Sequence, residues 1–200
     1  MICKFDVDPI IKEFELTCKP IIVEVNKFDE ASAKEFRKNF ALAHSTGQPV
    51  IPVVIDSYGG QVYSLMSMIS TIRHSELPVA TIVQGKAMSC GAILFSCGKD
   101  RMRYMDPDAT IMIHDVSSMS FGKVEEIKSN ADETDRLNIK VYQIMASNIG
   151  KSDDYFLKQI HDKGHADWFL DAEECKSINL ANHLRVPKFD VRIMVDICFE

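Results

Sequence analysis

A serine lies between a predicted strand and a predicted helix, in the segment Gly85-Lys-Ala-Met-Ser89-Cys-Gly-Ala92. Small neighbouring residues allow a sharp turn there, and such a turn exposes a nucleophilic hydroxyl near a helix N-terminus in many hydrolases. The strict Gly-x-Ser-x-Gly pattern is not met, because position 87 is alanine. A serine at the start of a helix is also commonly an N-cap. Taken alone, the segment is therefore compatible with a nucleophile or with a simple cap.

A second turn of this kind precedes it, in the segment Asp56-Ser-Tyr-Gly-Gly60 between another predicted strand and helix. Paired glycines permit backbone angles that leave main-chain N–H groups pointing outward. Such N–H groups can hold a phosphate or stabilise an oxyanion. The alternative is a plain tight turn, and this segment alone favours that alternative.

A nucleophilic serine needs a base, and the base needs an orienting group. His114 is the best-placed of six histidines, because it ends the apolar run at residues 111–113. Catalytic side chains in α/β proteins gather at the C-terminal ends of strands. A surface histidine at a strand end is the alternative interpretation. The orienting acid cannot be chosen from spacing, since the chain offers many carboxylates.

The predicted elements that must position these residues alternate between strands and helices. Apolar or alternating runs predict strands at residues 20–25, 50–55, 79–83, 101–105, 110–114 and 191–197. Apolar residues at helical spacing predict helices at residues 31–44, 62–72 and 123–148, with shorter ones capped by Ser152 and Asp171. Strands that alternate with helices indicate βαβ units and an α/β fold.

Composition and charge exclude several classes of protein. The 200 residues are 46% hydrophobic and 26% charged, which is typical of one globular domain. A net charge of −6 argues against nucleic-acid binding through phosphate contacts. The sequence shows neither a membrane span nor a signal peptide. The six cysteines include no Cys-x-x-Cys pair, so we expect no zinc site. Without a secretory signal, we expect them to be reduced thiols in a cytoplasmic protein.

Four segments together, in order, resemble the ClpP family of Clp protease proteolytic subunits. The first two are the glycine turn, similar to the family's Asn-Ser-Pro-Gly-Gly, and the serine segment, similar to Gly-Gln-Ala-Ala-Ser-Met-Gly-Ala. The others are Ile111-Met-Ile-His114, similar to Val-Met-Ile-His, and residues 167–174, similar to Asp-Arg-Phe-Leu-Ser-Ala-Glu-Glu. The resemblance covers about residues 20–180. The interval from Ser89 to His114 agrees with the family. The interval from His114 to Asp167 is a few residues longer than is usual in the family.

The resemblance implies a serine endopeptidase with a Ser-His-Asp triad and no cofactor or metal ion. Ser89 would be the nucleophile, His114 the general base, and Asp167 the residue that orients His114. The backbone N–H groups of Gly60 and Cys90 would form the oxyanion hole. The Cys90 side chain itself is expected to be a small core residue.

The resemblance also implies a fold and an assembly. The fold would be the α/β spiral of βαβ units that ClpP shares with crotonases, in a single protease domain at residues 20–200. Residues 1–19 would be an N-terminal segment in the place of the family's axial loop, and residues 115–150 a protruding strand-helix handle. Handles would pair heptameric rings, homomeric or mixed, into a tetradecamer that receives unfolded polypeptides from an AAA+ unfoldase. No nucleic-acid or membrane partner is implied.

Several departures from the family keep other interpretations open. Asp115-Val116 replaces the usual Gln-Pro after the base, residues 179–182 alter a late motif, and residues 1–19 match poorly. A carboxylate at Asp115 could raise the pKa of the base through charge proximity, or simply be exposed. One alternative is a non-catalytic ring subunit. Another is a crotonase-fold enzyme acting on acyl-CoA, although that superfamily normally lacks the Ser-His-Asp set.

Overall fold

A seven-stranded, mostly parallel sheet forms the centre of the computed structural model, which describes residues 13–18, 20–189 and 191–196. Strand β4 pairs in parallel with three strands: with β3 in both halves of its length, with β5 in its first half and with β6 in its second half. Strand β7 adds to β6 in antiparallel orientation. The strands are β2 (Val23–Val25), β3 (Ile51–Ser57), β4 (Val79–Met88), β5 (Arg103–Met105), β6 (Thr110–Ile113), β7 (Trp168–Leu170) and β8 (His183–Leu184).

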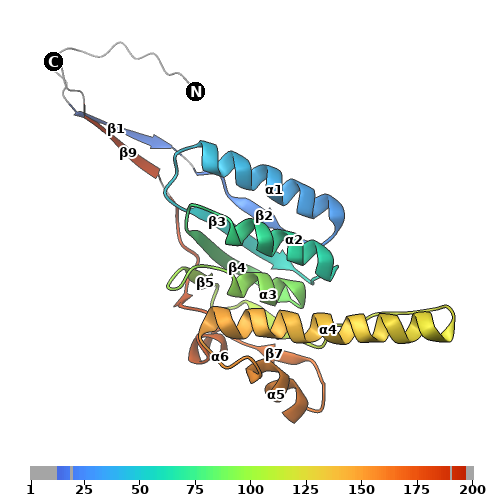
Figure 1. Cartoon of the computed structure of the whole chain (residues 1–200). Helices are drawn as coiled ribbons and strands as arrows, with labels where there is room; N and C mark the ends of the chain where they lie inside the picture. Colours follow the sequence, from blue (N-terminus) through green and yellow to red (C-terminus); the bar gives the residue numbers. More distant parts are fainter. Residues whose placement is uncertain (1–12, 19, 190, 197–200) are drawn as a thin grey trace.

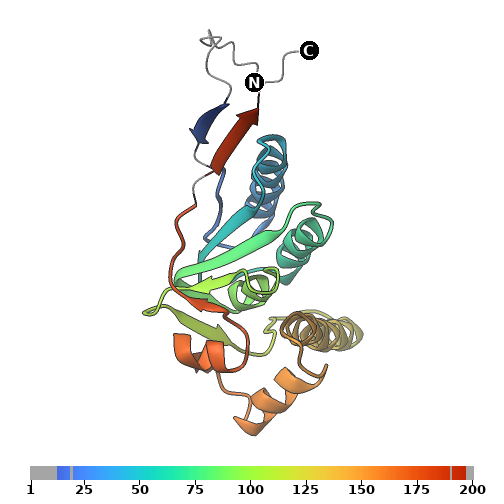
Figure 2. The ribbon, with the colours of Figure 1, turned by 90° about the vertical axis from the view of Figure 1, so that its left-hand side faces the viewer.

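Helices α1 to α4 lie along one face of this sheet, and α5 and α6 lie at its lower end (Figures 1 and 2). The helices are α1 (Glu30–Ser45), α2 (Val62–Arg73), α3 (Cys90–Ser96), α4 (Val124–Ile149), α5 (Tyr155–Asp162) and α6 (Ala172–Ser177). The predicted α/β class is confirmed by this alternation of parallel strands and helices. Both β3 and the first half of β4 are buried, as continuous apolar strands require.

Local capping explains where several helices begin. The Asp29 side chain accepts from the Ser32 N–H at 2.7 Å, and the Ser32 hydroxyl oxygen accepts from the Asp29 N–H at 2.9 Å. The predicted capping box of Asp171 and Glu174 is present at the start of α6. The predicted cap at Ser152 is wrong, because α5 begins at Tyr155 with Asp154 in the N-cap position.

Helix α4 extends beyond the sheet in Figure 1. Its C-terminal half is buried through residues such as Leu137, Val141 and Met145, whereas its first turns are exposed. The long helix predicted for residues 123–148 is thus present. The strand of the predicted strand-helix handle, which would have to precede this helix in residues 115–122, is not formed within the described chain. A strand needs a hydrogen-bonded partner, and here the Val116 N–H donates instead to the Asn138 side chain at 3.0 Å.

A separate two-stranded sheet joins the two ends of the chain. Strands β1 (Glu13–Cys18) and β9 (Val191–Asp196) pair antiparallel and extend away from the main sheet (Figures 1 and 2). The predicted C-terminal strand is confirmed over residues 191–196, whereas β1 was not predicted. The first twelve residues of the predicted N-terminal segment lie outside the described residues.

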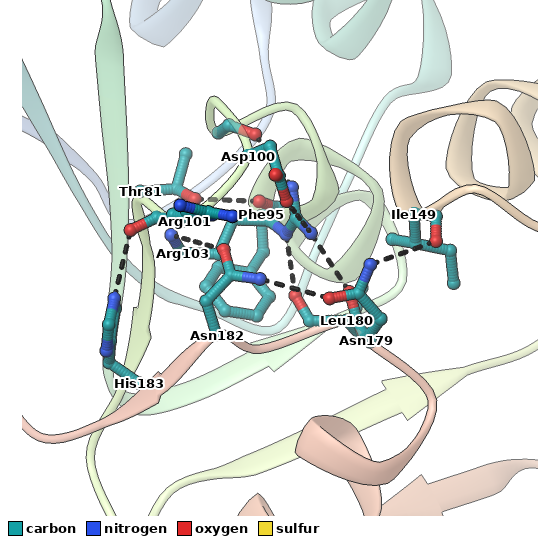
Figure 3. Close-up of polar contacts among 11 residues, drawn as sticks. Thr81, Phe95, Asp100, Arg101, Arg103, Ile149, Asn179, Leu180, Asn182 and His183 are labelled. Atoms are coloured by element: carbon teal, nitrogen blue, oxygen red, sulfur yellow. Dashed lines mark hydrogen bonds and ion pairs between the residues drawn. The ribbon is translucent and has the colours of Figure 1, made fainter.

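A buried arginine fixes the far edge of the main sheet (Figure 3). The Arg103 guanidinium donates to the carbonyl oxygens of Gly98, Asn179 and Leu180 at 3.0–3.1 Å. Asn182 pairs with the Arg103 backbone in both directions. Residues 179–182 depart from the family's late motif. Through these hydrogen bonds they hold the edge of the sheet next to β8 (His183–Leu184).

Candidate active site

Ser89 lies at the turn between β4 and α3, in a backbone conformation that is rare for a residue with a side chain. Its φ is 54° and its ψ is −119°. Its N–H donates to the Met112 carbonyl of β6 at 2.8 Å. Its hydroxyl makes no capping hydrogen bond to α3, so the simple N-cap interpretation is wrong. Such a conformation costs about 1–3 kcal/mol and is often found at functional sites.

This strain predicts a stability difference between two inactivating substitutions. Ser89→Gly removes the hydroxyl and relieves the positive φ, whereas Ser89→Ala removes the hydroxyl and keeps the strain. We expect the glycine variant to have the higher free energy of unfolding, by about 1 kcal/mol. Thermal denaturation should then give a melting temperature roughly 2–4 °C above that of the alanine variant. Equal melting temperatures would contradict a strained turn.

The glycine turn after β3 packs directly against Ser89. A Cβ built on Gly59, whose φ is 107°, would lie 2.8 Å from the Ser89 Cβ and 3.3 Å from its Oγ. A Cβ on Gly60 would lie 2.4 Å from the Phe28 carbonyl oxygen. A side chain at position 59 would therefore push the Ser89 turn away, and a side chain at position 60 would displace Phe28. The sequence indicated Gly60 for this site but did not single out Gly59.

The backbone N–H groups of Gly60 and Cys90 lie in this region, and neither takes part in the strand or helix next to it. Gly60 bridges to Phe28 through the N–H of the following Gln61, which donates to the Phe28 carbonyl at 2.7 Å. Cys90 is the first residue of α3, and the first N–H groups of a helix have no intrahelical acceptor. The Cys90 thiol donates to the Gly60 carbonyl oxygen at 3.2 Å and so links the two turns.

The Cys90 side chain is buried, with 1% of its surface exposed, as expected for a small core residue. Burial raises the pKa of its thiol to about 11. The thiol is therefore protonated at neutral pH and is a poor nucleophile, because the thiolate is the reactive form.

His114 and Asp167 lie at facing ends of an antiparallel strand pair. Strand β6 pairs with β7 so that Ile113 faces Trp168, and His114 and Asp167 are the next residues beyond this last pair. His114 is half-buried and Asp167 is exposed. Strand β7 was not predicted, so this strand pairing came from the structure, whereas the resemblance had already implied that Asp167 orients His114.

The hydrogen bonds of a complete triad are not formed in the described part of the chain. No hydrogen bond joins Ser89 to His114, or His114 to Asp167, among the residues that the structure describes. The histidine–carboxylate pair present nearby is a different one, in which His165 Nδ1 lies 2.7 Å from Asp115 Oδ2. Catalytic hydrogen bonds commonly tighten only when substrate binds.

A charged group that the sequence did not indicate lies on the strands leading to both turns. Lys86 Nζ lies 2.7 Å from Asp56 Oδ1 and 4.4 Å from the centre of the Tyr58 ring. The hydrogen bond to Asp56 raises the pKa of Lys86, so the amine stays protonated and is not available as a base for Ser89. The feature of the sequence that could have indicated this ion pair is one residue of each charge beside the two turns, Asp56 at the first turn and Lys86 at the second.

The fold defines an α/β protein with a parallel spiral sheet, and comparison with known proteins identifies its family. A family model described as Clp protease matches residues 12–187, and the chain belongs to this family. It is also 30% identical over 142 residues to the ATP-dependent Clp protease proteolytic subunit 1 of Salinibacter ruber (strain DSM 13855 / M31). The alignment covers 71% of this chain and 59% of that relative, which is less than two thirds of its length. The resemblance inferred from four sequence segments is confirmed at the level of the family.

Proposed function

We propose that the chain is a serine endopeptidase that hydrolyses peptide bonds of unfolded polypeptides. The observation that carries the proposal is the strained turn at Ser89, with a hydroxyl that does not cap α3 and a glycine turn packed against it. Ser89 attacks the peptide carbonyl, and His114 takes the hydroxyl proton and later gives it to the leaving amine. Asp167 orients His114 and stabilises its protonated form.

The proposed oxyanion hole consists of the backbone N–H groups of Gly60 and Cys90. Negative charge develops on the carbonyl oxygen as Ser89 attacks, and preformed donors stabilise that charge. One such donor typically contributes about 3 kcal/mol to lowering the barrier. Main-chain donors also explain why a cysteine can occupy position 90, since its side chain points into the core.

We propose that the protein works as a ring assembly fed by an AAA+ unfoldase. Large apolar side chains are exposed around the protruding start of α4, where Met119 is 83% and Phe121 85% exposed, followed by Val124 and Ile127. Exposed apolar patches of this kind mark interaction surfaces. They support pairing of two heptameric rings, homomeric or mixed, through the handles. Native mass spectrometry tests this assembly, with fourteen subunits expected and a monomer contradicting it.

No helix of the described residues is long and apolar enough to cross a membrane.

Labelling with a fluorophosphonate probe tests the proposed chemistry. Intact-protein mass spectrometry should show one adduct, peptide mapping should place it on Ser89, and Ser89→Ala should abolish it. Ser70→Ala, a change at an exposed position of α2, is the matched control and should leave labelling unchanged.

A non-catalytic ring subunit is the second candidate, favoured by the lack of triad hydrogen bonds among the described residues. An assembled, folded protein that does not react with the probe would contradict the peptidase and support this candidate. Turnover of an acyl-CoA ester without labelling would instead support a crotonase-like enzyme.

A further inference from the structure

We propose that Asp115 and His165 are a positioning pair, whose hydrogen bond holds the loop carrying Asp167 against the strand end carrying His114. The proposal rests on the proposed function, because it concerns the alignment of His114 with Asp167. It assigns a role to a carboxylate whose environment the sequence left undecided.

The Asp115 carboxylate connects three separate parts of the chain. Its Oδ1 accepts from Asn138 Nδ2 at 2.9 Å and from the Tyr142 hydroxyl at 3.1 Å, both on α4. Its Oδ2 lies 2.7 Å from His165 Nδ1, on the loop between α5 and β7. Asp115 itself directly follows His114 at the end of β6. One side chain thus joins the strand end, the long helix and the loop.

The helix side of this connection is firmly anchored. Tyr142 is buried, and its ring stacks near that of the buried Phe156 with centres 6.2 Å apart. Asn138 holds the same strand end a second time, because its Oδ1 accepts from the Val116 N–H. Burial opposes ionisation of Asp115, but hydrogen bonds from Asn138, His165 and Tyr142 outweigh it and lower the pKa of the carboxyl. The carboxylate is therefore charged and fixed at neutral pH.

The loop side depends on His165. Residues 161–167 are exposed, and among the described residues His165 makes the side-chain hydrogen bond that ties residues 163–167 to another part of the fold. Its φ of 59° lies in the left-handed region, and its N–H donates to the Ile160 carbonyl at 2.9 Å. Asp167 follows two residues later. Because each partner lies within two residues of a proposed triad member, a displaced pair would displace His114 from Asp167.

Two substitutions of nearly equal shape separate the hydrogen bond from simple loop structure. Asparagine and aspartate both tolerate the left-handed conformation at position 165. The asparagine amide donates roughly where His165 Nδ1 does, whereas an aspartate carboxylate repels Asp115. We expect His165→Asn to keep kcat for a fluorogenic peptide within about twofold. His165→Asp should lower kcat roughly ten- to hundredfold with little change in KM, because a displaced catalytic group slows the chemical step.

A double variant that combines Asp115→Asn with His165→Asp is expected to restore the activity that His165→Asp loses. The amide introduced at position 115 keeps an oxygen that can accept from Asn138 and Tyr142, while its NH₂ group donates to the carboxylate introduced at position 165. The direction of the hydrogen bond is reversed and the contact is kept. We therefore expect kcat to recover to within a fewfold of the wild-type value, roughly tenfold above His165→Asp alone.

The outcomes distinguish this proposal from the proposed function. Wild-type protein without Ser89-dependent labelling overturns the peptidase. Wild-type labelling with equal kcat values for His165→Asn and His165→Asp, or no recovery in the double variant, overturns the positioning pair. Hydrogen exchange in a Ser89→Ala background tests the contact without activity: His165→Asp should speed exchange in residues 163–167, and His165→Asn should not. Equal exchange in both variants also overturns it.

Discussion

Replacing His114 by glutamine is expected to lower kcat for peptide hydrolysis by about 10⁵- to 10⁶-fold. Glutamine keeps a polar side chain of similar length but cannot take the proton from Ser89 or return it to the leaving amine. The Ser89 hydroxyl then remains a weak nucleophile, and the residual rate comes from the oxyanion hole and from substrate binding. Steady-state hydrolysis of a fluorogenic peptide, with KM little changed, measures the effect.

The control for this substitution is another histidine in the same region. His161, at the end of α5, is exposed and lies next to His165 in a T-shaped ring contact. His161→Gln should keep kcat within about twofold of the wild type, because it changes no proposed triad residue and leaves the hydrogen bond between His165 and Asp115 in place. A loss of activity that is similar in both variants would show that His114 is not the specific base. An active His114→Gln variant would remove His114 from the mechanism.

Replacing Arg103 by methionine is expected to lower the free energy of unfolding by about 3–5 kcal/mol. Arg103 is 1% exposed and donates to three carbonyl oxygens at the edge of the sheet (Figure 3). Methionine fills part of the same space, but it removes the donor from the buried carbonyl oxygens of Gly98 and Leu180 and from the part-buried carbonyl oxygen of Asn179. In a chain of this size the melting temperature should fall by roughly 10 °C, which thermal or chemical denaturation measures.

A neighbouring arginine offers the matched comparison. Arg101 is exposed and has a φ of 63°, so methionine at position 101 inherits the same backbone strain without removing a buried donor. Arg101→Met should change the free energy of unfolding by less than about 0.5 kcal/mol. If both variants lost equal stability, the hydrogen bonds of Arg103 would not be the cause.

The elements that could be predicted from the sequence are those with a strong local pattern. Continuous apolar runs located β3 and the buried half of β4, and helical spacing located α1, α2 and α4. Periodicity and capping depend on residues a few positions apart, which is why they are readable along the chain. Strands β1, β7 and β8 were not predicted, since short strands exist through partners that are distant in sequence. The pairing of β1 with β9 joins the two ends of the chain.

In the candidate site, too, some features could be predicted from the sequence and others depended on the tertiary structure. Four short motifs in order were sufficient to indicate the family and to nominate Ser89, His114 and Asp167, because residue types at sharp turns and strand ends carry a local signature. Tertiary structure alone decided that Gly59 packs on Ser89, that β6 pairs with β7 next to His114 and Asp167, and that Asp115 pairs with His165. These contacts join residues about 30 to 50 positions apart. Their geometry follows from how strands pair and helices pack, and no local pattern in the sequence encodes it.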